Sequence, residues 1–194
     1  MLRTEDFKLL TTHGKLDVKK DSEAKIRNDL FMMGSLKLRF SNDENKNIDL
    51  RIVGYEVPLQ SGQSRGKCID LLAYDSNLNP YIIELKKGLS TDKLDMVCEQ
   101  IKDYQSDLSK LIKNISIEIK NKLFISNFAL TSDIKKIILA PRIYFEKNKK
   151  LKNGFQDIMK QNSDILFTSF SNLKDVENIL VNNKDIVELK IYNK

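Results

Sequence analysis

Two carboxylates and one ammonium group lie close together in the middle of the chain, as Asp70, Glu84 and Lys86. Glu84 and Lys86 are two residues apart, so in a β-strand their side chains point to the same face. Hydrolysis of a phosphodiester needs positive charge beside the phosphate and an activated water. Two carboxylates can hold a divalent cation that provides both, and a neighbouring lysine can orient the water. The three residues are therefore candidate catalytic residues for phosphodiester hydrolysis.

The flanking sequence predicts the elements that would bring these residues together. CIDLLAYD (68–75) and YIIELKK (81–87) are typical of strands, and the turn SNLNP between them predicts a hairpin. Across its ladder Asp70 can approach Glu84 and Lys86. An exposed cross-strand salt-bridge cluster is the alternative interpretation. Both strands are apolar on both faces, which is typical of strands buried on both sides, where unpaired carboxylates are costly.

The scarcity of soft ligands limits the choice of metal. The chain has one histidine, His13, and two cysteines, Cys68 and Cys98, whereas zinc sites use clusters of these residues. We expect His13 in a solvated loop and both cysteines as reduced thiols. Carboxylates favour Mg²⁺ or Mn²⁺ instead. The predicted metal ligands are the side chains of Asp70 and Glu84 and the main-chain carbonyl of Leu85.

The string RGKCIDLLAYDSNLNPYIIELKKG resembles the PD-(D/E)xK nuclease superfamily, in the subgroup with a GxIDLLAxD…IELKxG pattern. This superfamily includes many restriction endonucleases, junction resolvases and repair nucleases. Ile69 stands where the family name has proline, a variation that leaves the carboxylate of Asp70 in place. Gln100 and Tyr104 fit the Gln and Tyr of the family's following helix, four residues apart on one helix face. The family's earlier acidic residue corresponds to Glu56 or Glu23.

The resemblance implies a Mg²⁺-dependent (or Mn²⁺-dependent) nuclease that hydrolyses DNA phosphodiester bonds. Asp70 and Glu84 would hold the metal, Lys86 would position the water, and Gln100 and Glu56 would support the site. Two alternatives stay open. One is a non-catalytic nucleic-acid-binding or structural protein on the same fold, and the other is an RNA-cutting or partner-dependent nuclease subunit.

The order of predicted elements indicates an α/β fold, a restriction-endonuclease-like core with a mixed β-sheet flanked by helices. We predict a single nuclease domain over 1–194, with a catalytic core at about 21–143 and a C-terminal strand-helix-strand extension at about 144–194. The predicted helices cover 21–33, a segment capped by Ser90 or Thr91 that leans helical to about 133, and 171–183. The remaining predicted strands are 36–40, 48–59, 135–145, 164–170 and 186–192. The predicted turns and loops are 41–47, 61–67 and 146–154.

A net charge of +6 in 194 residues modestly favours a polyanionic partner, here DNA. Candidate DNA contacts are Arg65, Lys67, Lys87, Tyr104, Lys149 and Lys150. The alternative is a solvated surface for the basic residues, and for Gln100 and Tyr104 ordinary helix-surface and core positions. A homodimer or a larger nuclease complex stays open. No apolar run approaches the ~20 residues of a membrane span, and the first residues lack a secretory apolar core, so we expect a cytoplasmic protein without a membrane partner. A second Glu-Leu-Lys, at 188–190, is interpreted as an edge strand with ordinary charges.

Overall fold

The computed structural model describes residues 23–40, 43–60, 67–88, 90–148, 154–170 and 187–191. Its elements are α1 (Glu23–Met33), β1 (Ser35–Phe40), β2 (Asp43–Pro58), β3 (Cys68–Tyr74), β4 (Pro80–Leu85), α2 (Leu94–Leu123), β5 (Lys135–Pro141), α3 (Arg142–Asn148), α4 (Phe155–Gln161), β6 (Ile165–Phe170) and β7 (Val187–Ile191). None of the helices in these ranges is both long and apolar enough to cross a membrane.

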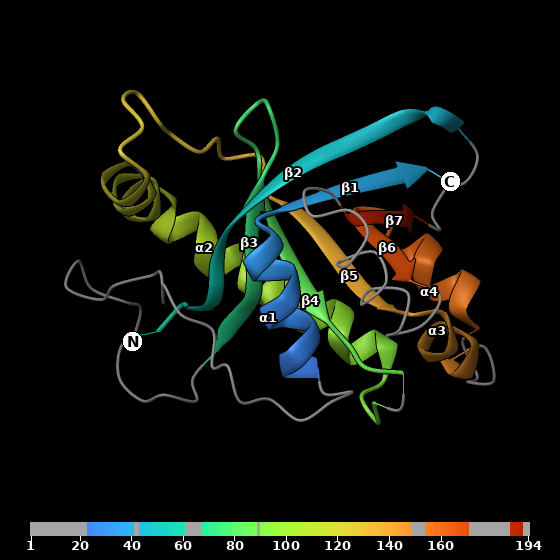
Figure 1. The fold of residues 1–194 in the computed structure, drawn as a ribbon. Helices are drawn as coiled ribbons and strands as arrows, with labels where there is room; N and C mark the ends of the chain where they lie inside the picture. Colours follow the sequence, from blue (N-terminus) through green and yellow to red (C-terminus); the bar gives the residue numbers. More distant parts are fainter. Residues whose placement is uncertain are drawn as a thin grey trace.

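The strands of the described residues form one mixed sheet in chain order. β1 to β4 are antiparallel neighbours, and β4, β5 and β6 run parallel to one another. β7 pairs antiparallel with β6 and parallel with β1, which closes the sheet. Figure 1 shows α1 and α2 on opposite faces of this sheet. The predicted α/β architecture, a mixed sheet flanked by helices, is confirmed.

The sheet separates two hydrophobic cores. One contains Ile26 and Leu30 of α1, and the other contains the buried stripe of α2 together with residues of α3 and α4. Neighbouring residues of β3 divide between them, since Leu71 belongs to the α1 core and Leu72 to the α2 core. β3 and β4 are therefore buried on both faces, as predicted. A charged side chain on either strand loses most of its water.

Helix α2 supplies the longest apolar stripe against the sheet. Its predicted core positions, including Val97, Ile101 and Leu108, are buried. The predicted cap at Ser90 or Thr91 is wrong, because the helix begins at Leu94 without a side-chain cap. Ser90 Oγ instead accepts the N–H of Asp92 at 3.3 Å in the preceding loop. The segment 109–133 is helical only to Leu123.

Two further boundaries and the predicted edge position of β7 also differ from the predictions. The turn predicted at 41–47 is too long, because β2 begins at Asp43 and pairs with β1. The strand predicted at 135–145 ends at Pro141, and the apolar residues Tyr144 and Phe145 are buried from helix α3 instead. β7 is not an edge strand, because it has a partner on each side. His13, residues 61–66 of the predicted loop, the segment 149–153 and the helix predicted at 171–183 lie outside the described residues.

Candidate active site

The β3–β4 hairpin brings the two predicted carboxylates together. Its ladder pairs Leu71 with Ile83, and extending this register by one residue places Asp70 opposite Glu84. The N–H of Leu85 donates to Oδ2 of Asp70 at 2.8 Å. A main-chain donor of one strand therefore fixes the Asp70 side chain of the other. Both carboxylates are buried, with 7% of Asp70 and 3% of Glu84 exposed.

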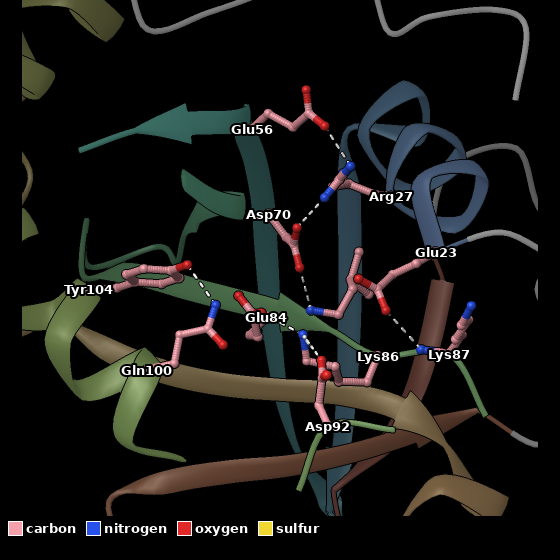
Figure 2. A network of polar contacts seen from close by, with 11 residues as sticks. Glu23, Arg27, Glu56, Asp70, Glu84, Lys86, Lys87, Asp92, Gln100 and Tyr104 are labelled. Atoms are coloured by element: carbon pink, nitrogen blue, oxygen red, sulfur yellow. Dashed lines mark hydrogen bonds and ion pairs between the residues drawn. The ribbon is translucent and has the colours of Figure 1, made fainter. Parts of the chain in front are cut away.

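Lys86 completes the predicted group although it lies just beyond the end of β4. The strand predicted at 81–87 is two residues too long, yet the N–H of Lys86 still donates to the carbonyl of Leu139 at 2.9 Å. Nζ of Lys86 lies 2.9 Å from Oε1 of Glu84 and 3.2 Å from Oδ2 of Asp92 (Figure 2). The structure thus brings Asp70, Glu84 and Lys86 into one cluster, called here the site cluster.

Glu84 is the carboxylate of the site cluster whose charged form is least well stabilised. Burial, reinforced by the charge of Asp70, raises the pKa of Glu84 to about 8, against the opposing effect of Lys86. Its second oxygen, Oε2, is buried without a hydrogen-bond partner in the structure. A buried carboxylate oxygen without a donor is costly. Lys86 therefore satisfies only one of the two oxygens of Glu84.

Lys86 remains a cation at neutral pH. Burial acts to lower the pKa of Lys86, but the charge and hydrogen bond of Glu84 outweigh it and raise the pKa above its ordinary value. The ammonium group therefore donates hydrogen bonds and supplies positive charge, and it is not a base in this structure.

Helix α1 contributes two residues to the site, and one of them was not predicted. Glu23 accepts the N–H of Lys87 at 3.1 Å, and burial raises the pKa of Glu23. Arg27 donates to Oδ1 of Asp70 and to Oε1 of Glu56 (Figure 2). The predicted helper Glu56 therefore reaches Asp70 only through Arg27. The sequence signal for Arg27 is its position four residues after Glu23, on the same helix face.

Gln100 and Tyr104 meet on the face of α2 that lies beside Glu84 (Figure 2). Nε2 of Gln100 donates to the hydroxyl of Tyr104 at 2.6 Å. Burial raises the pKa of Tyr104 to about 12, so its hydroxyl is neutral near pH 7. The pair predicted from its four-residue spacing is therefore formed next to the site cluster.

The predicted DNA contacts are mostly not tested by the structure. Lys87 is exposed. Lys67 is also exposed, and its Nζ lies 3.4 Å from Asp103 and 3.9 Å from Asp107 of α2, so it is already paired within the chain. Arg65, Lys149 and Lys150 lie outside the described residues.

The donors at the site suit a hard cation better than a soft one. Among the described residues, no three His, Cys, Asp or Glu side chains gather in the geometry of a metal site. Two carboxylates are available, and the unpartnered Oε2 of Glu84 fits a hard divalent ion that takes its other ligands from main chain, water or phosphate. Both oxygens of Asp70 have donors, Leu85 on one and Arg27 on the other.

The chain has one distant similarity among solved structures and no match among family models or curated proteins. A search of solved structures found similarity to the crystal structure of a repair endonuclease from Pyrococcus abyssi, with a TM-score of 0.34 and 18% identity. The similar region covers 64% of this chain and 38% of that one.

Proposed function

We propose that this chain is a metal-dependent nuclease that hydrolyses DNA phosphodiester bonds at the site cluster. The observation that carries the proposal is Glu84: a buried carboxylate with one oxygen unpartnered, beside Asp70 and the ammonium of Lys86. A cluster that served only to stabilise the fold would be expected to satisfy that oxygen. Its resemblance to the D…ExK pattern of the PD-(D/E)xK nucleases agrees with this chemistry.

Each residue has a role that follows from its surroundings. Lys86, held protonated 2.9 Å from Glu84, would donate a hydrogen bond to the attacking water or to a phosphate oxygen. Gln100 supplies an amide next to Glu84, where it would help to orient the carboxylate. The neutral hydroxyl of Tyr104 would anchor that amide through their 2.6 Å hydrogen bond.

A divalent cation such as Mg²⁺ or Mn²⁺, held by Asp70, Glu84 and the main-chain carbonyl of Leu85, would supply positive charge against the phosphate and acidify water. Two carboxylates and one carbonyl leave several positions for water and phosphate oxygens, as Mg²⁺ prefers. Ca²⁺ is larger and acidifies water less. We therefore expect Ca²⁺ to tighten DNA binding by offsetting the negative charge of the site, without supporting cleavage.

The test is incubation of the purified chain with plasmid, linear, single-stranded and branched DNA, and with RNA, in EDTA, Ca²⁺, Mg²⁺ or Mn²⁺. Cleavage of DNA in Mg²⁺ or Mn²⁺ only is the expected result. Undiminished cleavage in EDTA by repeatedly purified protein would rule out the metal mechanism. Cleavage of RNA alone would change the substrate class. No cleavage in any condition would favour a non-catalytic protein or a subunit that needs a partner.

A further inference from the structure

Arg27 is the point at which α1 meets the site cluster (Figure 2). Its Nη1 donates to Oδ1 of Asp70, and its Nη2 donates to Oε1 of Glu56 at 2.5 Å. The guanidinium carbon lies 5.3 Å from the ring centroid of Tyr55, a cation–π distance. Only 15% of the Arg27 side chain is exposed. Two carboxylates and an aromatic ring therefore hold this cation where solvent screens it little.

The two oxygens of Asp70 differ in how readily they could change partner. Oδ2 accepts a main-chain N–H from Leu85, in the paired strand, and losing that bond would disturb the hairpin. Oδ1 accepts only a side-chain donor, Arg27, and a side chain can move by rotamer changes. Oδ1 is therefore the oxygen that Asp70 can offer to another cation.

A guanidinium and a divalent cation at the same carboxylate oxygen repel each other. The repulsion is strong at a few ångströms in a buried site, because the effective dielectric constant is low there. The neighbouring Glu84 has an oxygen without any donor. Asp70 therefore has a cation from the chain itself, Arg27, on Oδ1, whereas Glu84 has no cation on Oε2.

We propose that Arg27 is an internal counter-cation that competes with the divalent cation for Asp70, an inference that rests on the proposed function. With the metal bound, the Arg27–Asp70 ion pair opens and Arg27 keeps Glu56 as its anchor. Arg27 is thus a positioning residue that acts through Asp70. The coupling is reciprocal, so Arg27 weakens metal binding by the same factor by which the metal weakens the ion pair.

The first test compares Mn²⁺ affinity by titration calorimetry in the wild-type chain, Arg27→Gln and Lys25→Gln. Lys25→Gln is the matched control, because it removes the same charge from the same helix, where Lys25 pairs with Asp29 at 2.6 Å. We expect Arg27→Gln to bind Mn²⁺ about tenfold more tightly, since it removes a nearby positive charge. We expect Lys25→Gln to stay within about twofold of wild type.

A second test needs no loss of the arginine and so does not depend on whether Arg27→Gln folds. In wild-type protein labelled with ¹⁵N-arginine, addition of Mg²⁺ should shift the side-chain NMR signal of Arg27, assigned by its disappearance in Arg27→Lys. A merely structural ion pair would leave this signal in place, and that result would overturn the inference.

The remaining outcomes separate this inference from the proposed function. Equal or weaker Mn²⁺ binding in Arg27→Gln than in wild type overturns the inference. The proposed function survives that result if the wild-type chain binds Mn²⁺ and Glu84→Gln does not. If neither the wild-type chain nor Arg27→Gln binds Mn²⁺, the proposed metal site fails and the inference fails with it.

Discussion

Two charged clusters of the molecule, each with a buried lysine, are built differently. In the first, Nζ of Lys86 meets Glu84 and Asp92, and Glu84 keeps an unpartnered oxygen. In the second, called here the Lys136 cluster, Nζ of Lys136 on β5 bonds the amide oxygen of Gln105 and lies 2.7 Å from Asp164. Lys136 itself is only 3% exposed.

The Lys136 cluster pairs one cation with one carboxylate, whereas the site cluster leaves Oε2 of Glu84 without a hydrogen-bond partner. One ammonium faces one carboxylate in the former, and Gln105 uses its other end to donate to the carbonyl of Ile134 at 3.0 Å. The hydrogen bond and charge of Lys136 lower the pKa of Asp164 against the opposing effect of partial burial. In the site cluster the pKa of Glu84 is raised instead. Burial of charge alone therefore does not distinguish the two clusters, whereas the unpartnered Oε2 and the raised pKa of Glu84 do.

The largest expected effect is that substitutions in the site cluster, but not in the Lys136 cluster, abolish DNA cleavage. Asp70→Ala, Glu84→Ala and Lys86→Ala should each lower the rate of DNA cleavage at least about 10³-fold, since each removes a group that acts on the reacting phosphate or water. Their circular dichroism spectra should match wild type. Asp164→Asn, in the Lys136 cluster, should cleave within about twofold of wild type. Activity retained in Glu84→Ala would contradict the assignment of catalysis to the site cluster.

The Lys136 cluster should matter for stability instead. Asp164→Asn leaves the buried ammonium of Lys136 without its carboxylate, and breaking a buried ion pair is destabilising. Asp164 is 56% exposed, so solvent reduces the cost, and we expect a loss of about 1–2 kcal/mol in the free energy of unfolding. Urea denaturation measures it. An unchanged urea midpoint would show that the Lys136–Asp164 pair contributes nothing to stability, as is found for many exposed ion pairs.

The site cluster could be predicted from sequence because its geometry is local. A strand puts Glu84 and Lys86 on one face, and a short turn sets Asp70 opposite them. Arg27 could not be predicted in the same way, because it reaches Asp70 from a helix 43 residues away in sequence and only tertiary packing brings them together. Asp92 was missed for a similar reason, since it lies in the loop before α2.

The fold was predictable where periodicity was clear. The hairpin and the stripe of α2 follow directly from spacing. The apolar run 135–145 could not show that β5 ends at Pro141 and that α3 follows, because a continuous apolar segment fits a buried strand and a buried helix equally well. The seven-residue α4 is too short to show a clear helical period in the sequence.

The two clusters should also give opposite dependences of stability on pH in EDTA. The pKa of Glu84 rises from its ordinary 4.5 to about 8 on folding, so its contribution to stability is full below pH 4.5 and is lost as pH rises through 8. The pKa of Asp164 falls below its ordinary 3.8, so its contribution is present above that pH and is lost below it.

Glu84→Gln isolates the first of these slopes. It removes the ionisable group while Lys86 keeps Asp92 at 3.2 Å. Since each pKa unit corresponds to about 1.4 kcal/mol, the metal-free variant should be more stable than wild type at pH 8.5 by at least about 1 kcal/mol. The control Glu99→Gln, at an exposed position of α2, should follow the wild-type curve. A wild-type free energy of unfolding that is flat between pH 5 and pH 9 would contradict the raised pKa of Glu84.

The smallest expected effect concerns the second Glu-Leu-Lys of the chain. The register of β7 places Glu188 opposite Lys37 of β1, whereas the hairpin register places Glu84 opposite a carboxylate, Asp70. In this register the β1 partner position of Glu188 supplies no second carboxylate for a divalent cation. Glu188→Gln should therefore cleave DNA within about twofold of wild type, measured beside Glu84→Gln under identical Mg²⁺ conditions. A loss of cleavage in Glu188→Gln with retained cleavage in Glu84→Gln would assign catalysis to β7 instead. The Glu-Leu-Lys at 188–190 would then act without an aspartate paired with its glutamate.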